Sequence, residues 1–247
     1  MAAFVLSALL LVISATLKAE TWKITSLEWP PYSGQDLPGQ GTAIAELRGV
    51  LAAEGIDLEV RFFPWERAKR AAARPEYVGY FPAWPEEVRA GFIGSRPVQD
   101  SIVGVLYRID QPVRWSSIME LFETHRVGLV QSYVYPDLIT RAAQEYPDNV
   151  NLAPHEISLM RMLASGRMDV AITDPCVTLY IARRHGITNI QASSRPISIK
   201  PLVVAFHART ENLARIEFLN ALLEPPFKAS IPRCQGVEYE MGPVDRN

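Results

Sequence analysis

Asp174 occupies a position at which an acidic side chain could take part in binding chemistry. Residues 168–172 form a short apolar run that predicts a strand, and Asp174 follows soon after it. In open parallel sheets, ligands bind in the crevice beyond the carboxyl ends of the strands, so an acid there can serve a ligand. The side chain of Asp174 or of Thr173 can instead cap the next helix, with Pro175 in its first turn. The local pattern favours the cap and leaves the ligand role open.

Two aromatic residues lie near the end of the first predicted strand. Residues 22–27 alternate in polarity and are rich in β-forming types, and the loop after them contains Trp29 and Tyr32 on either side of two prolines. The prolines stiffen the loop and hold both rings near the strand end. The rings either cover the edge of the core or form the wall of a pocket.

Cys176 and Cys234 are the two cysteines of the 247-residue chain. In an oxidising compartment such a pair can form a disulfide, although the sequence does not show whether their Cα atoms come within reach. A thiol nucleophile is the less favoured alternative, because no histidine is spaced to pair with either cysteine. No metal-ligand spacing is visible either, so we expect no metal and no cofactor.

Predicted strands and helices alternate along the chain, which is the pattern of an α/β protein with a parallel sheet. In the first series, strands are predicted over 22–27, 56–63 and 77–81, and helices over 42–54 and from 65 onward. A second series follows a polar break, with strands over 126–131, 150–152 and 168–172 and helices over 115–123, 136–146, 156–164 and 177–184. Residues 102–107 and 197–206 are longer apolar extended runs, and 212–223 predicts a closing helix.

The second predicted helix carries a basic run formed by Arg67, Lys69, Arg70 and Arg74. The apolar face of this helix is formed by other positions, beginning with Trp65. We interpret the basic side chains as a mostly solvated face rather than an anion site.

The first 19 residues predict a secretory signal, because an apolar core is followed by small residues and a cleavage point after about Ala19. Its apolar run is too short to span a bilayer comfortably, so we expect an exported, periplasmic protein. Removal of residues 1–19 leaves about 228 residues, enough for one large domain or two lobes. Their net charge is near −3, so no strong overall electrostatic field attracts this protein to nucleic acid or to a membrane surface. Partners are therefore expected at a local site.

Four stretches, taken in order, resemble one known family. They are Trp29-Pro30-Pro31-Tyr32, Arg89 followed by Phe92-Ile93-Gly94-Ser95-Arg96-Pro97, Arg126-Val127-Gly128-Leu129-Val130-Gln131-Ser132-Tyr133, and Gly166-Arg167-Met168-Asp169-Val170-Ala171-Ile172-Thr173-Asp174. Over nearly all of the mature chain, this order is similar to that of the family 3 extracellular solute-binding proteins. Members of that family are the polar amino acid-binding receptors of bacterial ABC importers.

The resemblance implies an α/β fold of the type II periplasmic binding protein kind. Two lobes, each a mainly parallel sheet with flanking helices, would be joined by two hinge strands. Carried over, lobe one is residues 20–103 and 202–247, and lobe two is residues 104–201. The extended runs 102–107 and 197–206 would be the hinge strands.

The resemblance also implies a binding site for an amino acid. Arg89 would hold the α-carboxylate, helped by Ser132 and Tyr133, because a guanidinium binds a carboxylate at two points. Asp174 would accept hydrogen bonds from the α-ammonium group.

This chain departs from the family pattern near Arg89 and after Gln131, which suggests a different solute. Tyr32, Trp84 and Tyr133 would then contact a flat or apolar part of it. The same rings could equally be part of the core.

We therefore expect a monomeric, non-enzymatic receptor that captures a small polar solute and delivers it to the membrane permease of an ABC importer. Two alternatives stay open. A secreted cyclohexadienyl-type dehydratase would need a general acid, for which Asp174 or Glu87 is the candidate. A sensor module would instead pass the ligand signal to a separate membrane partner.

Overall fold

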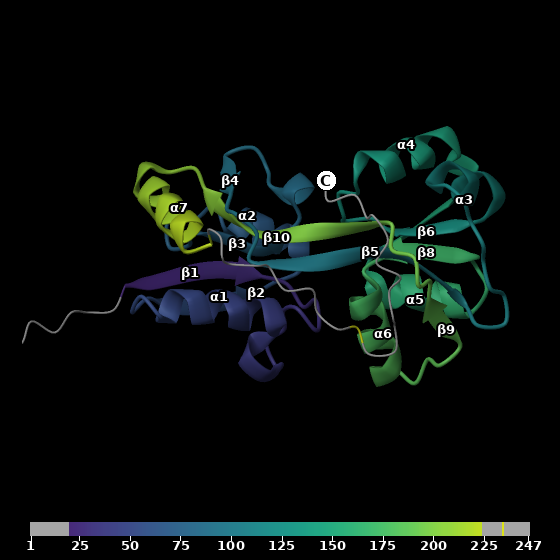
Figure 1. Ribbon diagram of the computed structural model, residues 1–247, viewed down its shortest axis with the longest axis horizontal. Coiled ribbons are helices and arrows are strands. Elements are labelled where there is room, and N and C mark those ends of the chain that lie inside the picture. Colours follow the sequence, from purple (N-terminus) through teal and green to yellow (C-terminus); the bar gives the residue numbers. More distant parts are fainter. Residues whose placement is uncertain (1–19, 224–233, 235–247) are drawn as a thin grey trace, which may run out of the picture.

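The computed structural model describes residues 20–223 and Cys234, and these residues form a mixed α/β fold (Figure 1). The predicted signal segment, residues 1–19, lies outside the described residues. The described residues contain seven α-helices and one ten-stranded sheet. The main strand order is β2-β1-β3-β10-β5-β8-β6-β7, with β4 paired to β10 and β9 paired to β5. No helix within these ranges is long and apolar enough to cross a membrane.

The first half of the fold lies on the left in Figure 1. Its strands are β1 (Thr21–Ser26), β2 (Asp57–Phe62), β3 (Gly79–Ala83) and β4 (Phe92–Gly94). Its helices are α1 (Thr42–Ala52), α2 (Trp65–Ala71) and α7 (Thr210–Leu222). Strand β1 pairs in parallel with both β2 and β3, so the carboxyl ends of these strands share one edge of the sheet.

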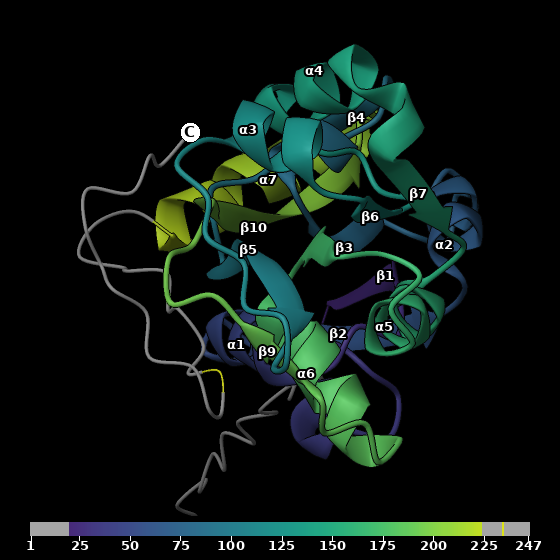
Figure 2. The same cartoon turned by 90° about the vertical axis from the view of Figure 1, so that its right-hand side faces the viewer.

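The second half repeats this plan. Its strands are β6 (Val127–Val130), β7 (Val150–Ala153), β8 (Val170–Thr173) and β9 (Ile190–Ala192). Its helices are α3 (Ile118–Thr124), α4 (Asp137–Glu145), α5 (Glu156–Ala164) and α6 (Pro175–Arg184). Strand β6 pairs in parallel with β7 and β8. Figure 2 shows α3 and α4 on one side of these strands and α5 and α6 on the other.

Two long antiparallel strands, β5 (Gln99–Arg108) and β10 (Ser198–His207), run through both halves. Strand β5 pairs with β10 as far as Val103 and with β8 from Gly104 onward. Gly104 lies directly beneath α6, where an added Cβ would come within 2.7 Å of Pro175 Cγ. Glycine is therefore required at this crossing, because a Cβ would force the helix away from the strand.

The predicted elements are confirmed to within a few residues at each end. The prediction missed β4 and β9, which have three residues each and too little alternation to be recognised. Their partners β10 and β5 impose the extended conformation on them. The cysteine alternatives are also resolved, because Cys176 and Cys234 are joined in a disulfide.

The prediction of a solvated basic face is wrong for Lys69. Arg67, Arg70 and Arg74 are exposed, but Lys69 is buried on the sheet-facing side of α2. Its Nζ lies 2.6 Å from Glu87 Oε2 and 2.8 Å from Glu66 Oε1. Burial of this charge is tolerated because two carboxylates surround it.

Candidate ligand-binding cleft

A cavity of about 590 Å³ lies where the carboxyl ends of parallel strands from the two halves face each other. The first half lines it with Leu27, Glu28 and Gln35 after β1 and with Phe62, Phe63, Pro64, Trp65 and Glu66 around the end of β2. The second half lines it with Ser132 and Tyr133 after β6 and with Pro154, His155 and Glu156 after β7. This is the edge at which α/β sheets bind ligands, and its size suits a small solute.

A smaller inner chamber of about 20 Å³ adjoins this cavity and has room for about one water molecule. Four of its eight lining residues are aromatic, namely Trp29, Trp65, Trp84 and Tyr133, and Glu87 lines it as well. The ring centroid of Trp84 lies 6.2 Å from that of Trp29 and 5.8 Å from that of Tyr133, and both contacts are edge-on. The aromatic side chains therefore fill most of this space with one another.

Asp174 is the N-cap of α6, as the local sequence pattern predicted. Its Oδ1 accepts hydrogen bonds from the backbone N–H groups of Cys176 at 2.7 Å and Val177 at 3.2 Å. Its Oδ2 accepts from the Tyr32 hydroxyl at 2.7 Å and from the Ile102 N–H at 3.2 Å. The residue is fully buried, and this burial raises its pKa to about 6 despite the four donors. The ligand role of Asp174 stays a prediction, because in this conformation both oxygens are engaged by the protein.

Of the three aromatic candidates, Trp84 and Tyr133 line the inner chamber. The Nε1 of Trp84 donates to Ser101 Oγ at 2.9 Å, which fixes its ring. Tyr32 is fully buried, stacks on Trp29 with centroids 4.5 Å apart, and lines neither the chamber nor the large cavity.

The structure brings Ser132 and Tyr133 to the wall of the large cavity but leaves Arg89 outside it. The Arg89 guanidinium forms an ion pair with Glu66, and its side chain is 40% exposed. Burial of Glu66 opposes its ionisation, but hydrogen bonds from Lys69 and Arg89 outweigh this and lower its pKa. A carboxylate-binding role for Arg89 therefore also stays a prediction.

Glu87 makes a contact between the two halves that the sequence did not suggest. It is nearly fully buried, and its Oε2 forms the 2.6 Å ion pair with Lys69. Its Oε1 accepts a 2.8 Å hydrogen bond from the backbone N–H of Val134, in the loop after β6. Glu87 is the last residue of a short 3-10 helix, Pro85–Glu87, that follows β3.

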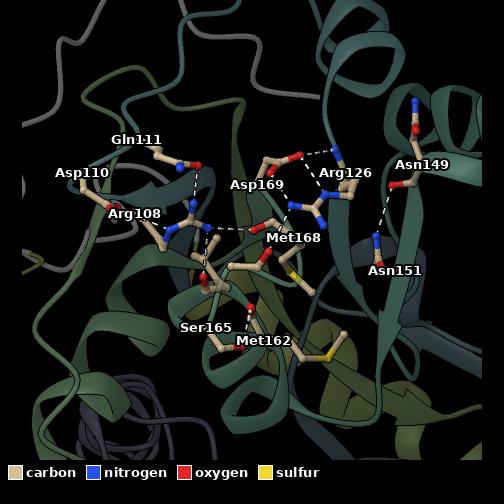
Figure 3. Close-up of polar contacts among 12 residues, drawn as sticks. Arg108, Asp110, Gln111, Arg126, Asn149, Asn151, Met162, Ser165, Met168 and Asp169 are labelled. Carbon is tan, nitrogen blue, oxygen red and sulfur yellow. Dashed lines mark hydrogen bonds and ion pairs between the residues drawn. The ribbon is translucent and has the colours of Figure 1, made fainter.

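The Gly-Arg-x-Asp part of the 166–174 segment lies at the opposite end of β8 from Asp174. Figure 3 shows Asp169 paired with Arg126, whose Nη2 lies 2.8 Å from Asp169 Oδ1. Hydrogen bonds from Arg126 are the main cause of the lowered pKa of Asp169. This pair joins the start of β6 to the start of β8 and is structural.

Within the described residues, no group of three or more His, Cys, Asp or Glu side chains is placed to hold a metal ion.

No protein-family model matches the chain, and no curated protein sequence matches it. Solved structures do match. A histidine kinase sensor domain with similarity to periplasmic binding proteins aligns with a TM-score of 0.66 and 23% identity, over 82% of this chain and 90% of that one. An ancestral arginine-binding protein bound to arginine aligns with a TM-score of 0.64 and 16% identity, over 82% of this chain and 90% of that one.

A third similar structure is an ancestral amino acid-binding protein described as a precursor of cyclohexadienyl dehydratase. It aligns with a TM-score of 0.61 and 19% identity, over 82% of this chain and 87% of that one. The chain therefore has the type II periplasmic binding protein fold and is structurally similar to periplasmic amino acid-binding proteins.

Proposed function

We propose that this chain is a solute-binding protein that captures a small polar solute, an amino acid or a related compound, between its two halves. The proposal rests on the cavity of about 590 Å³, because loops from both halves form its wall. A ligand that contacts both walls favours the arrangement in which the halves lie together. Residues 20–103 and 202–247 act as one lobe and residues 104–201 as the other, with β5 and β10 as the hinge.

The solute class is supported by the ligands named for similar structures, which include arginine and L-glutamate. An exported location is supported by the disulfide between Cys176 and Cys234, since such bonds persist in oxidising compartments. The partner in this proposal is the membrane permease of an ABC importer.

A sensor role is the second candidate, because one similar structure is a histidine kinase sensor domain. The two roles differ in the membrane partner that binds the liganded form of the protein. Stimulation of a reconstituted importer's ATPase by the liganded protein supports transport, and stimulation of a sensor kinase supports sensing.

The dehydratase alternative has less support. Asp174 and Glu87, its candidate acids, both accept hydrogen bonds from protein donors. Neither lines the large cavity, and Glu87, which lines the inner chamber, is paired with Lys69. We expect no turnover of a prephenate-like substrate, and product formation that is lost in Asp174→Asn would contradict this.

Thermal unfolding in the presence of a solute panel tests the proposed function. The panel holds amino acids, amines and organic acids, and native mass spectrometry identifies any retained compound. A true ligand at 100 times its Kd adds about 2.7 kcal/mol to the free energy of unfolding. Tyr133→Ala should reduce the ligand-induced rise in Tm. Tyr77 lines no part of this cavity, so Tyr77→Ala should leave that rise unchanged. The absence of a shift with every compound would contradict solute binding.

A further inference from the structure

If the cleft binds a solute as proposed above, the charges on its walls restrict the class of that solute. The ionisable residues that line the large cavity are Glu28, Glu66, His155 and Glu156. The described residues of this lining include no lysine and no arginine. A ligand carboxylate would therefore meet acids here and no permanent cation.

Two of these acids line a second cavity as well as the large one. A second cavity, of about 340 Å³, extends along α6, and three residues line both cavities: Glu28, His155 and Glu156. Glu28 follows β1 in the first half, and Glu156 is the first residue of α5 in the second half. The two acidic residues thus line the same two cavities from different halves of the fold.

The protein neutralises one acid of the large cavity but not these two. The Glu66 carboxylate is held by Lys69 and Arg89. Glu28 accepts a 3.0 Å hydrogen bond from the Gln35 N–H, and its side chain is exposed. Glu156 Oε1 is buried without a hydrogen-bond partner among the described residues. A buried carboxylate oxygen without a donor is strongly stabilised by a cationic donor, because burial has removed its water.

The second cavity is also lined by Asp36, His185 and one permanent cation, Arg184, whose Nη1 donates a 3.2 Å hydrogen bond to the Tyr180 hydroxyl. His155 Nδ1 accepts a 3.3 Å hydrogen bond from the Ser158 N–H. Trp29 is 5% exposed, and its Nε1 has no partner among the described residues; the buried Tyr133 hydroxyl likewise has none. Both residues line the inner chamber, where they offer neutral hydrogen bonds to an uncharged group.

We propose that the ligand is a small organic cation, an amine or guanidinium compound, whose charged group lies between Glu28 and Glu156. Phe62, Phe63 and Trp65 form the apolar wall along which its carbon chain packs. A carboxylate on the ligand is not required, because Arg89 is bound to Glu66 outside the cavity wall.

Matched pairs of compounds test this class by calorimetry and thermal unfolding. Agmatine is compared with arginine and cadaverine with lysine, because each pair differs only by an α-carboxylate. Glutamine, glutamate and a dicarboxylic acid serve as neutral and anionic probes. We expect each amine to bind at least as tightly as its amino acid and the anionic probes to give no measurable binding.

Isosteric variants test the location. Glu28→Gln and Glu156→Gln should each weaken amine binding by at least tenfold while the folded circular dichroism spectrum is kept. Glu54→Gln is the matched control, since Glu54 is exposed and lines neither cavity. It should bind the amine as the unmodified protein does.

The possible failures are distinguishable. Binding of glutamate or glutamine without binding of any amine would overturn the cationic class and leave solute binding intact. Binding of amines that is unaltered in both Glu28→Gln and Glu156→Gln would overturn the location. No binding by any compound of any class would overturn both this inference and the proposed function.

Discussion

The Tyr32 hydroxyl donates a 2.7 Å hydrogen bond to Asp174 Oδ2, although 142 residues separate the two in the sequence. Tyr32 belongs to the loop after β1, and Asp174 caps α6 in the other half. Both residues are fully buried. The bond therefore ties the two halves together through a contact that water does not reach.

Removing this hydroxyl should weaken the fold. In Tyr32→Phe, Asp174 Oδ2 keeps only the longer bond from Ile102, and a buried acceptor that loses a partner costs about 1–3 kcal/mol. Urea unfolding of Tyr32→Phe should show a free energy of unfolding that is lower by this amount. Tyr77→Phe is the control, because no hydrogen bond among the described residues involves the Tyr77 hydroxyl, and this variant should unfold as the unmodified protein does. An unchanged midpoint for Tyr32→Phe would show that the bond adds nothing to stability.

The buried Lys69–Glu87 pair should be more sensitive to substitution. Glu87→Gln removes one charge and leaves the Lys69 ammonium buried with Glu66 as its remaining partner. Breaking a buried pair from one side costs about 3–5 kcal/mol, and we expect the lower end because Glu66 stays. Urea unfolding of Glu87→Gln measures this loss.

The double variant Lys69→Met/Glu87→Gln tests whether the stability lost in Glu87→Gln comes from the unpaired charge of Lys69 or from the change in side-chain shape. It removes both charges and should regain most of the stability lost in the single variant. A double variant that is less stable than Glu87→Gln would mean that the lysine is not the cause of the loss.

Stability should fall as the pH rises from about 5 to about 8. Burial raises the pKa of Asp174 to about 6 and of Glu156 to about 7, whereas in the unfolded chain both titrate at about 4. The folded protein therefore binds more protons than the unfolded chain in this window, and the free energy of unfolding decreases with pH. At about 1.4 kcal/mol per pKa unit, we expect a loss of about 2–4 kcal/mol.

Urea titrations at several pH values measure this slope. Glu156→Gln should remove the larger part of it, because the pKa of Glu156 is raised further than that of Asp174, and Glu54→Gln should leave it unchanged. A protein that becomes more stable toward pH 8 would contradict the raised pKa values.

Reduction of the disulfide should destabilise the protein. The bond joins Cys176 at the start of α6 to Cys234, across a separation of 58 residues, and closing such a loop contributes about 2–4 kcal/mol. Thermal unfolding with and without dithiothreitol should show a lower Tm for the reduced protein. The variant Cys176→Ser/Cys234→Ser should match the reduced protein and show no response to dithiothreitol.

Local patterns predicted the secondary structure well. The helix predicted over residues 156–164 has the same bounds in the structure, and the predicted cap at Asp174 is confirmed. Both depend on neighbouring residues, since apolar spacing and capping act within one or two turns. Short strands such as β4 and β9 could not be found this way, because their conformation depends on partners distant in the sequence.

The candidate site was predicted in part. Ser132 and Tyr133 were predicted and line the large cavity, whereas Glu28 and Glu156 were missed. Their position just beyond the carboxyl ends of β1 and β7 was a signal that could have found them. Arg89 was selected by resemblance, and its pairing with Glu66 was not foreseeable because those residues belong to different elements.

The sequence by itself determined the order of strands and helices, the α/β class and the cap at Asp174, because these depend on periodicity and on short-range hydrogen bonds. Tertiary structure alone decided that Lys69 is buried, that Tyr32 reaches Asp174, and that Glu28 and Glu156 line the same space. A periodic pattern indicates which face of an element is covered but not by which distant side chain. Partners are settled only when the two halves pack together.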